Sequence, residues 1–156
     1  LPHDPAGPVF VALPFDHTIA TQMIDAIRKL KGSDRRFIVK SHPMTPSQFT
    51  ESEIIKKTDL PLNRQSGVSC VLYAATTVGL EALLGGLPTL RFRPSGKVPT
   101  DVIPLNLNVP SADATGLESA LRSLVLPDPV EPERFFTEPD YPLWESTLNI
   151  GASAAR

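Results

Sequence analysis

The stretch "VLYAATTVGLEALLGGLPTL", residues 71–90, decides the fold. It starts as part of an apolar run, residues 68–74, which is rich in β-branched side chains and typical of a buried strand. Two threonines and a glycine open a short apolar helix, which ends at Gly-Gly-Leu-Pro. A further apolar run, residues 88–92, predicts a second strand. This order of strand, helix and strand is typical of a parallel sheet covered by helices.

The alternation continues on the amino-terminal side of this unit. Strands are predicted at residues 9–15 and 37–40. Between them apolar residues recur at helical spacing from Ile19 to Leu30, and Asp16 offers a helix cap. "TPSQFTES", residues 45–52, is a candidate for a short helix, and "EIIKKTDLPL" for a strand or a loop.

On the carboxyl-terminal side, "VIPLN", residues 102–106, is a candidate strand, and residues 115–125 predict a helix. Thr115 and Glu118 have the spacing of a capping box at the start of that helix. Helices between successive strands, joined by short connections, predict a parallel sheet with helices on both faces.

Length and composition predict one globular domain with two appendages. The chain has 156 residues, of which 41% are hydrophobic and 21% charged, and its formal net charge is -2. These values suit one hydrophobic core and give no electrostatic footprint for nucleic acid. We expect a linker at residues 1–8, cut from a longer protein, the domain at 9–126, and a proline-rich tail with a short helix at 127–156.

The chain has one cysteine and no apolar run long enough to span a membrane. An internal disulfide is therefore excluded, and the start has no basic segment followed by an apolar one. We expect a cytoplasmic protein without a transmembrane segment.

Ligands of parallel sheets bind at the carboxyl ends of the strands, so the residues there are the candidate site. Lys40 and His42 follow one predicted strand, and Thr76, Thr77 and Gly79 follow another. Cationic and hydroxyl groups, together with free amides at a helix start, suit a phosphate. Gly79 would let a ligand approach the backbone. The threonines are also ordinary helix caps, a role that is compatible with phosphate binding.

Glu81 lies one turn into the helix that follows the threonines. A capping box from Thr77 would need an acid at position 80, so Glu81 is out of register for that role. A carboxylate here suits the hydroxyl pair of a ribose, and the alternative is a solvent-exposed helix face.

Several motifs are missing from the sequence, and each excludes a class of site. No G-x-G-x-x-G follows a strand, and no P-loop motif occurs, which argues against dinucleotide binding and P-loop phosphoryl transfer. There is no Asp-x-Asp pair, Cys/His cluster or G-x-S-x-G elbow. We expect no metal at the site.

Two segments together resemble a known family. "RFIVKSHP" and "SCVLYAATTVGLEALLGGLPTLRF" resemble the C-terminal, nucleotide-sugar-binding half of GT-B glycosyltransferases. The similarity is closest to bacterial capsule and surface-polysaccharide enzymes, including the sialyltransferase and Kdo-transferase groups. His42-Pro43 matches their His-Pro motif, and Thr76-Thr77 matches their Ser/Thr motif. The resemblance covers about residues 9–126.

The resemblance implies a fold and a chemistry. The fold would be a Rossmann-like three-layer α/β/α sandwich with a mostly parallel sheet, one half of the GT-B architecture. The ligand would be a nucleotide sugar, CMP- or UDP-linked, with no other cofactor. Lys40, His42, Thr76, Thr77 and Gly79 would then bind the phosphates.

In the same picture Glu81 binds the ribose. The partner would be the acceptor domain of the same protein, amino-terminal to this chain, which usually supplies the catalytic base. The catalytic residues are therefore unknown, and the isolated half is expected to be inactive. The proline-rich tail would cross back to the other half.

Two other interpretations remain open. An enzyme of the UDP-N-acetylglucosamine 2-epimerase type shares this architecture and would need acidic residues in the other half. A non-catalytic Rossmann-like module would bind a partner protein, and its polar strand ends would only be solvated.

Overall fold

The chain folds around one six-stranded parallel sheet. The structure, a computed structural model, describes residues 1–30, 34–98, 100–104 and 107–148. The strands lie in the order β3-β2-β1-β4-β5-β6, and every pairing is parallel. In chain order they are β1 (Val9–Ala12), β2 (Phe37–Lys40), β3 (Ile55–Lys57), β4 (Cys70–Tyr73), β5 (Thr89–Phe92) and β6 (Ser111–Ala112). The predicted parallel sheet is confirmed.

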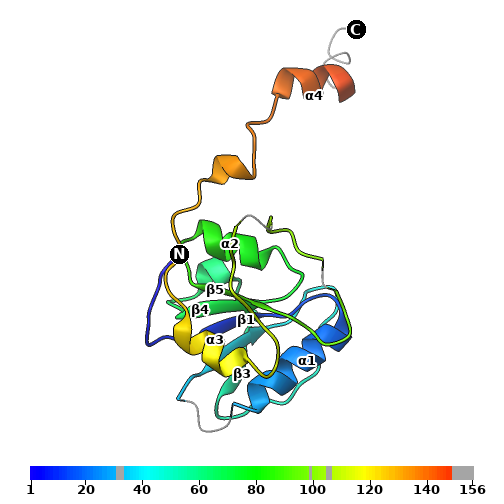
Figure 1. The fold of residues 1–156 in the computed structure, drawn as a ribbon. Coiled ribbons are helices and arrows are strands. Elements are labelled where there is room, and N and C mark those ends of the chain that lie inside the picture. The colour runs from blue at the N-terminus through cyan, green and yellow to red at the C-terminus, as the bar shows by residue number, and fades with distance from the viewer. Residues whose placement is uncertain (31–33, 99, 105–106, 149–156) are drawn as a thin grey trace.

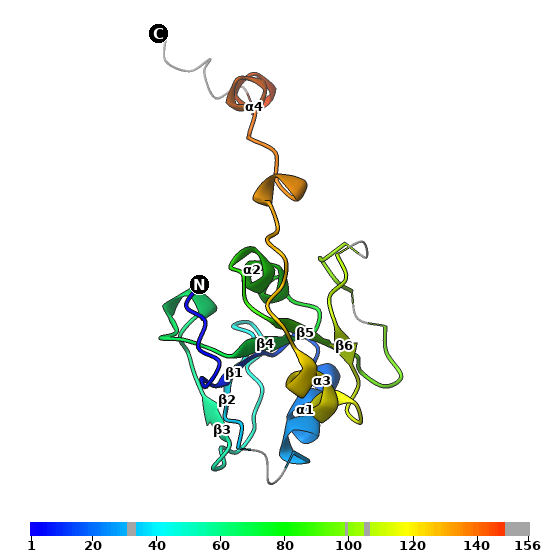
Figure 2. The same cartoon turned by 60° about the vertical axis from the view of Figure 1, so that its left-hand side comes forward.

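Helices cover both faces of this sheet, as Figures 1 and 2 show. Helices α1 (His17–Arg28) and α3 (Leu117–Ser123) lie on one face, and α2 (Val78–Leu84) lies on the other. Each face buries its own apolar cluster, centred on Met23 of α1 on one side and on Leu83 of α2 on the other. The Rossmann-like three-layer α/β/α architecture is confirmed.

The structure corrects three local predictions. Residues 45–52 form no helix. Residues 102–104 form no strand, and the rest of that candidate, residues 105–106, lies outside the described residues. The strand next to β5 is instead β6, which is only two residues long.

The start of α3 also differs from its predicted capping box. No side chain caps the helix at Gly116, its first flanking residue. The Asp113 carboxylate instead accepts hydrogen bonds from the backbone amides of Thr115 and Gly116, at 3.0 and 2.9 Å. The Thr115 hydroxyl also donates to this carboxylate, at 2.7 Å, so it is engaged with Asp113 and makes no capping box.

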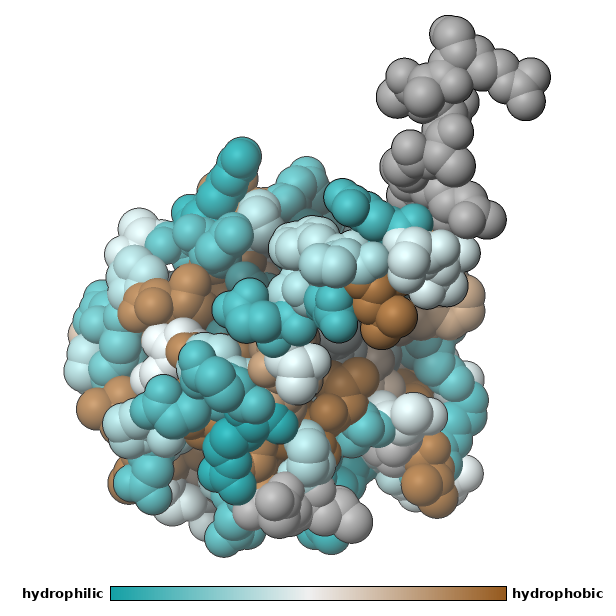
Figure 3. Space-filling view, turned by 90° about the horizontal axis from the view of Figure 1, so that it is seen from above, coloured by the Kyte–Doolittle hydropathy of each residue, from teal (hydrophilic) through white to brown (hydrophobic). Residues whose placement is uncertain are grey.

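The two ends of the chain behave differently. Residues 1–8 lie against the body, where the Asp4 amide donates to the Val68 carbonyl at 3.0 Å. The tail after α3 runs away from the sheet through the 3₁₀ turn η2 (Pro132–Arg134) to α4 (Tyr141–Leu148), as Figure 1 shows. No residue of α4 is buried. Figure 3 looks down on this side of the molecule, where hydrophobic residues are exposed among hydrophilic ones.

None of the helices within the described residues is both long enough and apolar enough to cross a membrane.

Candidate functional site

The strand order creates one place where a ligand can enter from the carboxyl edge. From β1 the chain moves outward to β2 and β3, then returns to β4 and moves the other way to β5 and β6. The connections after β1 and β4 therefore leave in opposite directions, and in open α/β sheets ligands commonly bind outside the carboxyl ends of the strands at such a point. This switch point lies between Ala12 and Tyr73, which are paired across the two strands.

The loops after β1 and β2 meet in a corner beside this switch point. The rings of Phe15 and His42 pack edge to face, with centroids 5.5 Å apart and planes at 87°. The Thr45 hydroxyl donates to the Phe15 carbonyl at 3.0 Å. The Met44 amide donates to Nδ1 of His42 at 3.3 Å, so the proton of the neutral imidazole lies on Nε2. His42 therefore keeps one donor for a ligand.

The loops after β1 and β5 are tied together by polar contacts. Lys97 Nζ lies 2.5 Å from the Asp16 carboxylate. Gln22 of α1 exchanges two hydrogen bonds with the backbone of Ser95, at 2.7 and 3.1 Å. Asp16 also caps α1 by accepting from the amides of Thr18 and Ile19, as predicted. The hydrogen bond from Lys97, followed by that from Ile19, lowers the pKa of Asp16.

The turn between β4 and α2 carries the two predicted threonines. Ala75 adopts a positive φ of 48°, which is uncommon for a residue other than glycine. The Thr76 hydroxyl accepts from the Val78 amide at 3.3 Å, whereas the side chain of Thr77 makes no capping hydrogen bond and is exposed. Thr76 thus has the structural role, and the hydroxyl of Thr77 is available to a ligand.

Gly79 has a different role from the predicted one. It is buried, and a Cβ built there would lie 2.5 Å from the Tyr73 ring. The absence of a side chain lets α2 approach the ring of Tyr73 on β4. This packing accounts for the glycine without a ligand.

Among the described residues, neither Lys40 nor Glu81 forms a hydrogen bond or salt bridge with the residues around His42. Lys40 Nζ donates to the Asp59 carbonyl at 2.9 Å, on the side of β3. Glu81 is exposed on α2. Within the described ranges neither side chain forms a salt bridge.

A buried polar network beneath α2 was not foreseen. Arg91 and Asp101 form an ion pair, and their side chains are only 16% and 15% exposed. The Tyr73 hydroxyl donates to Asp101 and accepts from Arg91 Nε, both at 3.1 Å. Burial raises the pKa of Tyr73, although the bond from Arg91 opposes this, so the phenol remains a neutral donor. Arg91 Nη2 is buried and has no hydrogen-bond partner among the described residues.

The register across the sheet could have revealed part of this network. Tyr73 and Arg91 are paired neighbours on β4 and β5, and both occupy positions whose side chains face α2. Asp101 lies 28 residues after Tyr73 in a loop, and no local pattern marks it.

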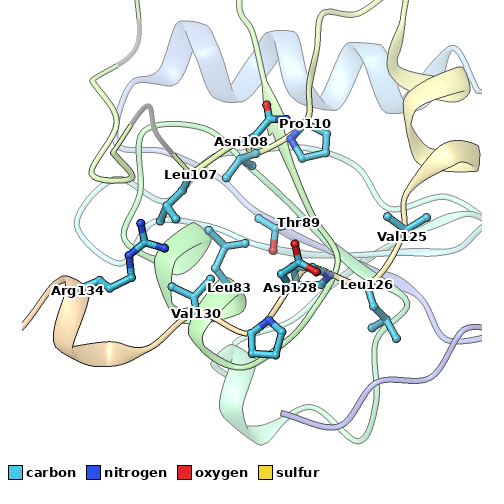
Figure 4. A pocket seen from close by; sticks show the side chains of 13 residues that line it. Leu83, Thr89, Leu107, Asn108, Pro110, Val125, Leu126, Asp128, Val130 and Arg134 are labelled. Carbon is cyan, nitrogen blue, oxygen red and sulfur yellow. The ribbon is translucent and has the colours of Figure 1, made fainter.

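A cavity lies at the opposite, amino edge of the sheet. It has a volume of about 480 Å³ and is bounded by the end of α2, the start of β5, the segment before β6 and the base of the tail. Figure 4 shows Leu83, Leu107, Val125 and Val130 around it, with Asp128 and Arg134 at its wall. None of the predicted site residues lines this cavity.

No protein-family model matches the chain, and no curated protein matches its sequence. Over the described residues, no three His, Cys, Asp or Glu side chains gather into a group that could hold a metal ion. The contacts among Phe15, His42 and Thr45, together with the exposed Thr77 after β4, make the carboxyl edge the candidate site.

Proposed function

We propose that this chain is the nucleotide-sugar-binding half of a GT-B glycosyltransferase that acts in surface-polysaccharide biosynthesis. One observation carries the proposal. His42 follows β2 and Thr77 follows β4, and these are the two strands that flank β1 at the switch point. The His-Pro and Ser/Thr motifs that suggested the family thus belong to one edge of one sheet.

The available donors suit the phosphates of a nucleotide donor. His42 Nε2 and the Thr77 hydroxyl are not used by the neighbouring contacts that hold their loops. Donors of this kind stabilise the negative charge that develops on the leaving nucleotide, which is usually a large term in transfer reactions. Lys40 would add its charge only after releasing the Asp59 carbonyl, and Glu81, on the exposed face of α2, would bind the ribose.

Binding of CMP, UDP and GDP, measured by calorimetry, tests the proposal. One of the three should bind with a Kd of about 1 mM or below, as expected for one half of a two-domain site. His42→Ala and Thr77→Ala should each weaken binding. His3→Ala is the matched control, because His3 lies at the amino edge beside Val68. If none of the three nucleotides binds, or if both site variants bind like the wild type, the proposal is wrong.

A non-catalytic interaction module is the second candidate, because the tail favours it. Phe136, Tyr141, Leu143, Trp144 and Leu148 are all more than half exposed, although all are large and apolar. Such residues suit contact with another protein surface. This function predicts no nucleotide binding, so the same titration separates the two candidates. An epimerase-like protein would also bind nucleotide, and only the product formed by the full-length enzyme would distinguish it.

A further inference from the structure

We infer that Phe15 is a stacking platform for the planar base of the bound nucleotide. This inference rests on the proposed function and assigns the base, rather than the phosphates, to a specific side chain. Phe15 is 58% exposed and lies three residues after the end of β1, at the edge where ligands of parallel sheets bind.

The structure holds this aromatic residue in place from several sides. The residue before it, Pro14, is buried, and the residue after it, Asp16, caps α1 and pairs with Lys97. The Phe15 carbonyl accepts from the Thr45 hydroxyl, and the ring packs against His42. The ring therefore stays exposed although its backbone is fixed, which lowers the entropy lost when a ligand binds.

Its neighbours favour a nucleotide over a purely apolar ligand. The edge-to-face contact with His42 leaves part of the phenyl ring uncovered. A base can stack on that surface while the phosphate of the same nucleotide approaches Nε2 of His42. Aromatic stacking of this kind tolerates any base, because every base has a π-face. The platform therefore adds affinity for nucleotides as a class, and the choice between cytosine and uracil must come from other groups.

The test compares ligands with and without a base. Calorimetry first shows whether the wild type binds CMP or UDP. The Phe15→Ala variant should bind that same nucleotide with roughly tenfold lower affinity than the wild type. It should bind ribose 5-phosphate like the wild type, because that ligand has no base. Phe15→Trp should retain nucleotide affinity. His42→Ala should weaken the binding of both kinds of ligand.

The chain offers a close control in Phe136, which is 57% exposed but lies on the tail. Phe136→Ala should leave nucleotide affinity unchanged. A second measurement covers ligands too weak for calorimetry: intermolecular NOEs should join the base protons to the Phe15 ring.

The outcomes separate this inference from the proposed function. Nucleotide binding that survives Phe15→Ala unchanged, or the absence of NOEs to the ring, overturns the platform and leaves the nucleotide site standing. Equal losses for nucleotide and for ribose 5-phosphate also overturn it, because Phe15 would then act only by positioning His42. If the wild type binds no nucleotide, both proposals fail together.

Discussion

The carboxyl edge of the sheet and the amino edge differ in how they are built. At the carboxyl edge, side chains tie the loops together: Lys97 reaches Asp16, and the Thr45 hydroxyl reaches the Phe15 carbonyl. At the amino edge lies a cavity of about 480 Å³, whose wall combines aliphatic side chains and the base of the tail with the polar Asn108, Asp128 and Arg134. None of the residues predicted to bind a ligand lines it.

The difference between the two edges shows that the proposed site rests on the topology of the sheet and not on cavity volume. In a parallel sheet the helix starts and their free amides face the carboxyl edge, so anions are favoured there. For this reason we place the proposed nucleotide site at the carboxyl edge and not at the amino-edge cavity.

The largest expected loss of stability comes from breaking the ion pair between Arg91 and Asp101 beneath α2. Asp101→Ala leaves the Arg91 guanidinium buried without its counter-charge, and should lower the free energy of unfolding by about 3 kcal/mol. Chemical denaturation measures this loss. The double variant Arg91→Leu with Asp101→Ala should lose less free energy of unfolding than the single variant Asp101→Ala. A double loss equal to the sum of both single losses would contradict a coupled pair.

A smaller loss of stability is expected when a side chain is introduced where α2 packs closely against β4. Gly79→Ala places a methyl group against the buried Tyr73 ring, and should lower the free energy of unfolding by about 2 kcal/mol. Thermal melting provides the measurement. Gly116→Ala is the matched control, because a Cβ there meets its nearest atom at 3.6 Å. If both alanine variants melt alike, the close approach to Tyr73 is not what requires glycine.

The contact between Asp16 and Lys97, which joins the loops after β1 and β5, should make the melting temperature depend on pH. The pKa of Asp16 is lowered in the folded state, so its charge stabilises the fold above the unfolded pKa, near the ordinary value of 3.8. That contribution disappears as the pH falls through the lower, folded pKa. Asp16→Asn should therefore melt at a lower temperature than the wild type at about pH 7, and the difference should shrink as the pH falls below 3.8. A difference that persists in acid would show that the charge is not responsible.

The smallest effect is expected at the amino edge. Val125 is 76% exposed at the wall of the cavity, so Val125→Ser should change the free energy of unfolding by less than about 0.5 kcal/mol. It should also leave nucleotide affinity unchanged. Calorimetry measures this affinity. Weaker nucleotide binding by Val125→Ser would indicate a site at the amino edge and would contradict our account.

Much of the fold follows from local patterns in the chain. Apolar runs marked β1, β2, β4 and β5, and Asp16 marked the start of α1. β6 could not be predicted, because two residues form no pattern and the strand exists only through its pairing with β5. The turn that Asp113 makes before α3 was not predicted, because Asp113 lies outside the four-residue capping box from Thr115 to Glu118.

The positions of the predicted site residues follow from the sequence better than their contacts do. The motifs placed His42 and the threonines at the carboxyl edge, because strand ends can be read from the sequence. Their partners could not be read in that way. Lys40 turns to the Asp59 carbonyl, and Gly79 serves the Tyr73 ring, because side-chain contacts depend on register and on distant loops.

The most direct test of the central claim is a chemical-shift map of the isotope-labelled chain titrated with CMP and UDP. Our account predicts that the perturbed amides cluster at the carboxyl edge, around Phe15, His42 and Thr77. Perturbations confined to the amino-edge cavity, around Leu83 and Val125, would contradict it. So would a spectrum that does not change at all.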